Sequence, residues 1–443
     1  MSASRIPMSS SPHLTPSRPT LLVESSPALP LVHLTVAFRN GAASDPLDKD
    51  GLARITARML RRGAGGMTSA QIEERIDALG ASLSAEVSSS VVSLHADVIS
   101  RSLDAFIDLL AKIVGEPTFD EVELGRLLRE AEGELIESRD NDRSLAVRHF
   151  RRHLFEGHAY GRRLGGQIPS LRGIVRDDVV RAYNRIFTRG NAVIAFSGDI
   201  TDVRAQELAD RIVAGLPDRP AEPTIIPEPT MKPGRRLVVV DKPERTQTQI
   251  LIGTLGSHPK DEDHFPLQVA TTVLGGTFTS RLMREVRSKR GWSYGAYARL
   301  PYEQRRDAFS MWTFPAATDA AACIALKLEL LHDWRQKGIT ARELAFVKKF
   351  MVRSHAFEID TADKRVQLRL DSELLDLPEG HHERYVEHVK EVQLEAANEA
   401  IRRRISEDDL LITVVGTHAQ IGDAVAKAIP RLDEVIVVPF DAE

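Results

Sequence analysis

The sequence predicts an α+β protein built from two copies of one domain. Three observations predict this fold class: a proline-rich break near the middle of the 443 residues, features that recur on both sides of it at a nearly constant offset, and strand-like and helix-like segments that come in blocks. A chain of this length has more residues than one hydrophobic core ordinarily supports, so more than one domain is expected. Because strands and helices do not alternate strictly, the pattern favours α+β over a doubly wound parallel sheet.

The clearest boundary is the segment 215–236, in which six prolines fall within 22 residues. Proline fixes φ and lacks a backbone N–H, so this density excludes a helix and an inner strand. Prolines also stiffen a connection into a semi-extended form. We therefore predict a linker at 217–235 between domains at 19–216 and 236–443, preceded by a loose arm rich in Ser and Pro at 1–18.

The two halves repeat the same order of features. In the first half a strand-like run leads to Gly41, a polar turn and a helical pattern that reaches Leu60. In the second half a similar run leads to Gly256, a polar turn and a helical pattern that reaches Leu274. The offsets are 215 and 214 residues, and the apolar run that ends at Gly198 recurs 218 residues later. Two copies of one domain explain these offsets better than coincidence does.

Periodicity predicts the remaining elements. Alternating apolar residues predict a β-hairpin, and apolar residues at helical spacing predict long amphipathic helices. In chain order we expect strands at 83–87 and 91–96 and helices at 103–113, 122–136, 318–334 and 341–356. Thr340 and Glu343 form a capping-box pattern that predicts the start of the last helix.

Composition limits the classes of function. The net charge is −4 with acidic and basic residues interspersed, which argues against a nucleic-acid partner. No segment approaches the run of about eighteen apolar residues that a membrane-spanning helix needs, so no membrane association is expected. The first residues lack the apolar core of a secretory signal, so we expect a cytoplasmic location and leave the periplasm open. Cys323, the single cysteine, excludes an internal disulfide and a cysteine-based zinc site.

The strongest positive signal is the segment 275–297, which reads GGTFTSRLMREVRSKRGWSYGAY. Its apolar residues have helical spacing as far as Gly291, which is expected to end the helix. A strand is expected to begin at Trp292. This arrangement brings Arg287 and Tyr294 together at a corner between helix and strand.

This segment closely resembles the second-domain signature of the insulinase (pitrilysin) family of zinc peptidases, in the branch of mitochondrial processing peptidase and its bacterial relatives. The shared features are Gly-Gly, Ser-Arg-Leu, Arg-x-x-Arg-Gly and a following Tyr. The resemblance implies two α/β-roll domains, each a mixed antiparallel sheet plus helices, arranged as a clam-like half shell. It also implies that Arg287 binds peptide substrate and that Tyr294 stabilises the oxyanion of the reaction. The alternative is a structural Arg beside a half-buried Tyr.

The first half lacks the metal ligands of that family. The resemblance aligns residues 54–58, which read RITAR, with the inverted zinc motif His-x-x-Glu-His. Arg54 and Arg58 stay protonated and have no lone pair for zinc, and Ala57 cannot activate water. Glu134 matches the third ligand of the family in placement, but it cannot hold a metal alone. We therefore expect no metal in this chain.

Arg54 and Arg58 have two interpretations. They are solvated arginines opposite an apolar stripe of their helix, or they line a chamber and attract peptide carboxylates.

Other candidate sites are weaker. His149 and His153 are four residues apart on a predicted helix, but three neighbouring arginines oppose zinc binding. His381, His382 and His388 are predicted to be surface histidines near a helix start. The sequence contains no phosphate-binding loop and no Gly-x-Ser-x-Gly nucleophile motif.

A chain with the Arg-Tyr pair but without zinc ligands implies a divided active site. We expect the zinc-free subunit of a heterodimeric or heterotetrameric metallopeptidase, inactive alone, that supplies Arg287 and Tyr294. A homologous subunit with His-x-x-Glu-His would supply the zinc, and peptides or unfolded segments would be cleaved in an enclosed chamber. The alternative is a non-enzymatic structural or peptide-binding subunit, because the core proteins of the respiratory cytochrome bc1 complex resemble this family without cleaving peptides.

Overall fold

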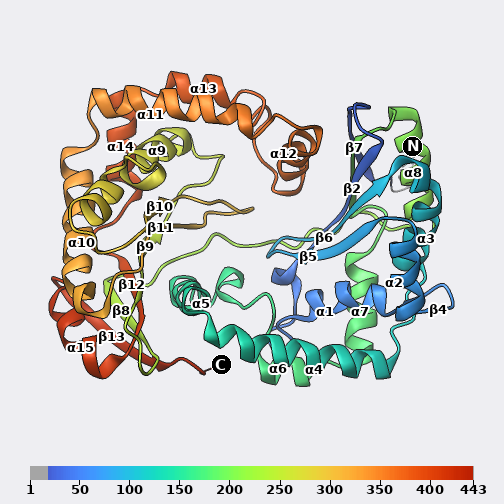
Figure 1. Cartoon of the computed structure of the whole chain (residues 1–443), viewed down its shortest axis with the longest axis horizontal. Helices are drawn as coiled ribbons and strands as arrows, with labels where there is room; N and C mark the ends of the chain where they lie inside the picture. The colour runs from blue at the N-terminus through green and yellow to red at the C-terminus, as the bar shows by residue number, and fades with distance from the viewer. Residues whose placement is uncertain (1–17, 443) are drawn as a thin grey trace, which may run out of the picture.

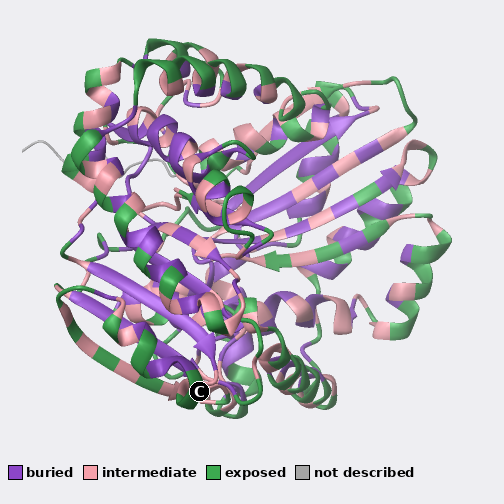
Figure 2. Ribbon diagram, turned by 60° about the vertical axis from the view of Figure 1, so that its left-hand side comes forward, coloured by how far each residue is buried: buried purple, intermediate pink, exposed green. Residues whose placement is uncertain are grey.

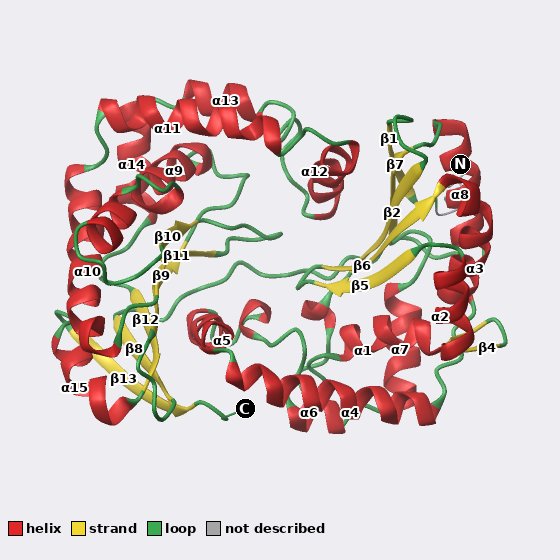
Figure 3. Ribbon diagram, viewed as in Figure 1, coloured by secondary structure: helices red, strands yellow, loops and turns green. Residues whose placement is uncertain are grey.

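The computed structural model describes residues 18–442 and contains two mixed β-sheets with helices around them (Figures 1 and 3). The strands of the first sheet are β1 (Thr20–Ser25), β2 (Leu31–Arg39), β5 (Ser82–Val87), β6 (Val91–Ile99) and β7 (Ala192–Gly198). Those of the second are β8 (Arg235–Asp241), β9 (Gln249–Leu255), β10 (Ala296–Arg299), β11 (Ala308–Thr313), β12 (Leu410–Gly416) and β13 (Leu432–Pro439). A small hairpin joins β3 (Gly63–Ala64) and β4 (Met67–Thr68). The α+β prediction is confirmed.

The two sheets have the same strand order. The first runs β1-β7-β2-β6-β5, and the second, read from its other edge, runs β13-β8-β12-β9-β11-β10. Without the additional edge strand β13, the two orders correspond position by position. In both sheets the second strand of this common order is parallel to the first and antiparallel to the third. The duplication that the sequence offsets predict is therefore present in the topology.

The helices of the first half lie between and after the strands of the first sheet in the chain. They are α1 (Leu52–Met59), α2 (Ser69–Ala78), α3 (Leu103–Gly115), α4 (Glu121–Glu137), α5 (Asp142–Leu154), α6 (Ile168–Arg172), α7 (Arg176–Ile186) and α8 (Asp202–Val213). Short 3-10 turns lie at η1 (Ala42–Ser44), η2 (Leu60–Arg62), η3 (Ser100–Ser102), η4 (Ser138–Asp140) and η5 (Ala159–Gly161). The predicted hairpin and the two predicted helices of this half are confirmed as β5–β6, α3 and α4.

The helices of the second half are α9 (His264–Thr271), α10 (Ala320–Lys337), α11 (Ala341–Ser354), α12 (Ala362–Leu374), α13 (Tyr385–Glu391), α14 (Leu394–Arg404) and α15 (His418–Lys427). Most of them lie on the left and along the top of Figure 1, whereas α12 lies near the strands of the first sheet. Two segments, η6 (Thr272–Gly276) and η7 (Met283–Ser288), are π-helical, and η8 (Ala317–Asp319) and η9 (His355–Phe357) are 3-10 turns. The capping box of Thr340 and Glu343 forms at α11 as predicted. Within the described part of the chain, no helix is long and apolar enough to cross a bilayer.

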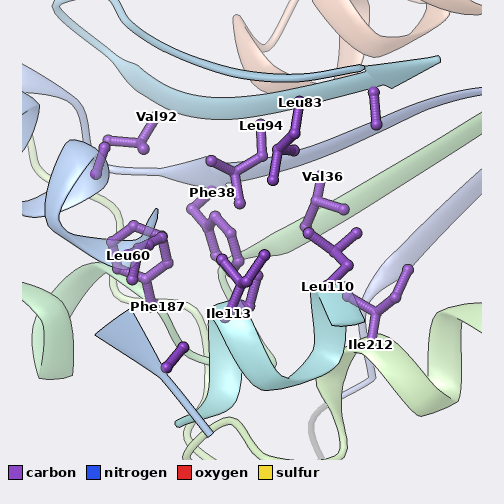
Figure 4. Packing of buried hydrophobic residues seen from close by; sticks show 14 of the residues in the cluster. Val36, Phe38, Leu60, Leu83, Val92, Leu94, Leu110, Ile113, Phe187 and Ile212 are labelled. Carbon is purple, nitrogen blue, oxygen red and sulfur yellow. The ribbon is translucent and has the colours of Figure 1, made fainter. Parts of the chain in front are cut away.

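The core of the first half lies between its sheet and the helices behind it (Figure 4). Val36 and Phe38 lie on one face of β2, because side chains alternate along a strand. They pack in one cluster with Leu110 and Ile113 of α3 and Ile212 of α8. Full burial of such a side chain contributes about 1.5–3 kcal/mol to stability. Figure 2 shows the same division in both halves, with buried central strands and exposed outer helix faces.

Helix α5 precedes the proline-rich segment in sequence but packs against the second sheet. Leu145, Phe150 and Leu154 of α5 form a buried cluster with Val238 of β8 and Leu411 of β12. The first half therefore covers one face of the second sheet with its own helix.

Helix α12 makes the reciprocal contact. Its residue Val366 is buried in one cluster with Ala37 of β2 and Val193 of β7, so the second half covers a face of the first sheet. Each half thus depends on the other for apolar burial. The division into domains at 19–216 and 236–443 remains a prediction.

The proline-rich segment between α8 and β8 contains neither helix nor strand. The side chain of Asn40 fixes it to the end of β2: its Nδ2 donates to the carbonyl of Glu222 at 2.8 Å, and its Oδ1 accepts from the N–H of Thr224 at 2.5 Å. The connection is therefore anchored along the first half. The predicted arm at 1–18 lies outside the described residues except for its last position.

A cluster of histidines and aromatic rings is buried in the second half. His381 is 5% exposed and lies against the rings of His264, Phe265 and Tyr302. The prediction of a surface histidine is therefore wrong for His381. Sequence alone could not show this, because the rings that cover His381 come from α9 and from the loop after β10.

We expect the free energy of unfolding to fall as the pH drops from about 6.5 to about 4. Burial lowers the pKa of His264 to about 4 and that of His381 to about 3, whereas both titrate near 6.5 in an unfolded chain. The unfolded state therefore binds more protons across this window, and acid favours unfolding. Urea unfolding at about pH 7 and about pH 5 measures the loss. His381→Phe keeps a ring without the titrating group and should lose less stability; an equal loss would contradict the assignment.

Candidate functional site

Helix α1 is held by the loop before it. The carboxylate of Asp45 accepts hydrogen bonds from the backbone N–H groups of Gly51 at 3.1 Å and Ala53 at 2.9 Å, which satisfies free donors of the first turn. Gly51 has φ +94°, a left-handed conformation that favours glycine. Burial raises the pKa of Asp45 to about 7. These contacts fix the direction in which α1 presents its side chains.

An ion-pair cluster occupies the positions that resemble a zinc site. Arg54 Nη2 lies 3.0 Å from Glu134 Oε2, and Arg58 Nη2 lies 2.9 Å from Glu134 Oε1. Arg58 also approaches Glu130 at 3.6 Å, and Arg62 binds the same Glu130. The arginines are four residues apart on α1 and η2, and the glutamates are four apart on α4, so each set lies on one helix face. Both oxygens of Glu134 are engaged by guanidinium groups.

Arg54 and Arg58 both bind Glu134, but their side chains are still 43% and 22% exposed, so the interpretation as solvated arginines remains a prediction. Whether they also line a substrate chamber remains a prediction. Ala57 is 1% exposed and belongs to the core cluster of the first half. Among residues 18–442, no group of three or more His, Cys, Asp or Glu side chains is arranged to hold a metal ion.

The second group of candidate residues lies in η7 and in the turn that leads from it to β10, in the left-hand half of Figure 1. Gly291, with φ +68°, ends the helical segment, and its N–H donates to the carbonyl of Arg287 at 2.9 Å. The strand begins at Ala296, so the prediction of a strand from Trp292 is wrong. The reason is Ser293, whose hydroxyl donates to the carbonyl of Gly295 at 2.7 Å and holds this stretch as a turn.

Arg287 lies against two exposed rings. Its guanidinium carbon is 4.4 Å from the ring centroid of Tyr294 and 4.5 Å from that of Phe278. Tyr294 is 75% exposed and Phe278 is 68% exposed. The alternative of a half-buried Tyr294 is therefore wrong. Exposed cation–π contacts contribute about 0.5–1 kcal/mol each, so they restrict the guanidinium without a large stabilisation of the fold.

The other cations of this segment are paired with carboxylates. Arg281 makes two hydrogen bonds of 2.7 Å to Glu343. Three cations share Glu285: Arg284 at 3.3 Å, Lys289 at 2.8 Å and Arg290 at 3.1 Å. Within the described chain, Arg287 has neither a carboxylate partner nor a hydrogen bond from its side chain. Its planar N–H donors are therefore available to an incoming acceptor.

Phe278 is the residue that sequence reasoning missed. It lies within the signature segment, nine residues before Arg287, and a large apolar side chain two residues after a pair of glycines is the sequence signal that could have identified it. Both flanking segments, η6 and η7, are π-helical. Such segments occur frequently at functional sites.

A large cavity lies elsewhere, around α5 and the loop 155–164. It has a volume of about 1200 Å³, and none of the candidate residues of either group lines it. Its charged side chains include paired groups, such as Arg151 with Asp307 at 2.8 Å. Burial raises the pKa of Glu303 at its wall to about 7. We assign no site to this cavity.

Two sequence profiles match the chain in succession. The profile described as Insulinase (Peptidase family M16) matches residues 20–167, and the profile described as Peptidase M16 inactive domain matches residues 173–351. Only five residues separate the two matches.

Relatives and solved structures agree with these matches. The chain is 21% identical to the "Non-peptidase homolog YmxG" of Helicobacter pylori, over 89% of this chain and 91% of that protein. It is 23% identical to the "Uncharacterized zinc protease YmxG" of Bacillus subtilis, over 89% and 95% of the two chains.

The fold is similar to the peptidase M16 inactive domain from Pseudomonas fluorescens, with a TM-score of 0.82 and 24% identity, over 89% of this chain and 95% of that chain. It is also similar to a chain of Complex III2 from Candida albicans, with a TM-score of 0.74 and 14% identity, over 94% and 98% of the two chains. The duplicated sheets and the two profile matches lead to one conclusion: the chain belongs to the insulinase family, peptidase family M16.

Proposed function

We propose that this chain is the zinc-free subunit of a heteromeric zinc peptidase. A homologous subunit with the His-x-x-Glu-His motif carries the metal, and this subunit supplies Arg287 and Tyr294. One observation carries the proposal: Arg287 has no acidic partner in a segment whose other cations are all paired, and it lies against the exposed Tyr294. The ion pairs at Glu134 support the assignment of the metal to a partner.

The two side chains have complementary roles in this proposal. Zinc in the partner subunit would supply an activated water for attack on the peptide bond. Arg287 donates hydrogen bonds to a peptide carbonyl and positions the substrate. The phenol of Tyr294 donates its O–H to the oxyanion that develops on the attacked carbonyl, and one such donor is typically worth about 10²–10³ in turnover.

The relatives support two parts of the proposal: the association with a zinc peptidase and the absence of peptidase activity from this chain alone. The Bacillus subtilis relative is described as a zinc protease, and the Helicobacter pylori relative as a non-peptidase homolog. A zinc-free subunit of a peptidase fits both descriptions. We keep the cytoplasm as the proposed compartment, although PqqL of Escherichia coli, which shares the fold at a TM-score of 0.74 and 17% identity, is described as periplasmic.

A structural or peptide-binding subunit is the second candidate function. The observation that favours it is the likeness in fold to the Complex III2 chain. A purely structural role leaves the unpaired Arg287 and the exposed Tyr294 and Phe278 without a function, so we place it second.

Co-expression with a homologous subunit that carries His-x-x-Glu-His tests the proposal. We expect cleavage of a quenched fluorescent peptide only when both chains are present, because the metal and the Arg-Tyr pair then face the same substrate. Each chain alone, purified in the same way, is the control. Cleavage by this chain alone with stoichiometric zinc, or equal cleavage by the partner alone, would refute a divided active site.

A further inference from the structure

The guanidinium N–H groups of Arg287 are restricted in position but donate no hydrogen bond within the described chain. Its contacts with Phe278 and Tyr294 involve the faces of the rings, so they restrict the guanidinium without occupying its N–H groups. Within residues 18–442, its side chain forms no hydrogen bond and no ion pair. An arginine in this state is preorganised for an acceptor from outside the chain, because little side-chain freedom remains to be lost on binding.

The charge around this arginine favours an anion. The stretch 281–290 contains five cationic side chains, Arg281, Arg284, Arg287, Lys289 and Arg290, and one acidic side chain, Glu285. Glu343 of α11 neutralises the first of them. Glu285 alone faces three others, so the positive charge near Arg287 is only partly compensated.

A peptide carbonyl uses only part of the five N–H donors of Arg287, and a carboxylate fits the donors that remain. A guanidinium presents parallel N–H donors that match the two oxygens of a carboxylate, and charged hydrogen bonds are roughly twice as strong as neutral ones. We infer that Phe278, Arg287 and Tyr294 form a carboxylate-binding site that selects acidic peptides. This inference rests on the proposed peptide-binding function and names its substrate class. The carboxylate belongs to an Asp or Glu side chain or to the C-terminus of the peptide.

Phe278 is a positioning residue in this site. Its ring contributes one of the two contacts that restrict the guanidinium of Arg287, and it is mostly exposed, so it contributes little to the core. Loss of this ring leaves the charge of Arg287 in place but frees the orientation of its donors. Phe278→Leu should therefore weaken binding of acidic peptides about threefold and leave neutral peptides unaffected.

Fluorescence anisotropy with the full chain and labelled peptides tests the inference. One arm compares a capped peptide that contains Glu with the same peptide that contains Gln. The other arm compares a free C-terminal carboxylate with a C-terminal amide. We expect the acid form to bind about tenfold tighter in at least one arm, and that arm identifies the source of the carboxylate. Equal binding of acid and amide forms in both arms would overturn the inference.

Matched variants distinguish binding at Arg287 from a general attraction of acidic peptides to the positive charge of this segment. Arg287→Gln should remove the preference for acid forms, whereas Arg284→Gln, which removes the same charge from a paired residue of the segment, should keep it. Phe357→Leu, at another exposed phenylalanine, is the control for Phe278→Leu. An equal loss in the two arginine variants would show a diffuse charge effect and refute the site. An unchanged Phe278→Leu variant would remove Phe278 from it.

The outcome is distinguishable from failure of the proposed function. If a two-chain complex cleaves peptides in a manner that depends on Tyr294 but acid and amide forms bind equally, the carboxylate inference is refuted and the divided active site stands. If the chain prefers acid forms but no combination with a partner cleaves peptides, the carboxylate site stands and the peptidase role is refuted.

Discussion

Replacement of Arg54 and Arg58 by histidine is expected to give a chain that binds zinc stoichiometrically. The two positions lie one helical turn apart on α1, and both side chains reach Glu134 of α4. Removal of the guanidinium groups frees the oxygens of Glu134, and two imidazoles with one carboxylate are a sufficient set of protein ligands for zinc. The zinc content after dialysis, measured by elemental analysis, checks the expectation.

Two control variants isolate the ligands. Arg54→Gln with Arg58→Gln frees Glu134 without supplying imidazoles, and it should remain free of zinc. Addition of Glu134→Gln to the histidine variant should weaken zinc binding, because the only anionic ligand is lost. A folded histidine variant that retains no zinc would show that α1 and α4 do not hold these positions at ligand distance.

The same variant is expected to bind zinc without cleaving peptides. Ala57 takes the place of the glutamate that activates water in the family motif, and it is packed in the apolar core cluster. A glutamate at this position would have to remain charged next to apolar side chains, which is unfavourable. Metal binding and catalysis are therefore separate losses in this chain, and two histidines restore only the first.

The duplicated fold could be predicted because equivalent features of the two halves recur at a nearly constant offset in the sequence. Gly41 and Gly256 mark equivalent turns at an offset of 215 residues, and the sheets confirm the repeat in their strand order. The exchange of α5 and α12 between the halves could not be predicted. An amphipathic helix shows that one face is buried, but its sequence does not say which sheet buries it.

The positions of the candidate residues come from the sequence, but their contacts could not be predicted from it. The sequence aligns Glu134 with a ligand position but does not reveal that Arg54 and Arg58 bind it. Glu134 lies 80 residues after Arg54 and 76 after Arg58, on another helix, and a sequence does not show which side chains of two such helices point toward each other. The π-helical form of η7, which contains Arg287, is likewise set by a shift in backbone hydrogen bonds, which no residue spacing in this segment marks. The contact of Phe278 with Arg287 follows from that local geometry.

The hydroxyl of Tyr294 is expected to carry most of the contribution of this subunit to catalysis. Tyr294→Phe should lower kcat of the two-chain complex about a hundredfold, because it removes one donor to the developing oxyanion. The substitution should leave the fold intact, since Tyr294 is exposed and its hydroxyl forms no hydrogen bond within the described chain. The ring also remains in place to contact Arg287.

A steady-state comparison of Tyr294→Phe with the unmodified complex separates the two roles of the residue. A donor that acts only on the transition state lowers kcat and leaves KM nearly unchanged, whereas a residue that only holds the substrate raises KM. Tyr297→Phe is the matched control, because it removes a phenol three residues away whose ring stacks on Trp312 at 5.7 Å. If Tyr294→Phe keeps the full kcat, the hydroxyl has no catalytic role and the Arg287 site is a substrate-binding surface alone.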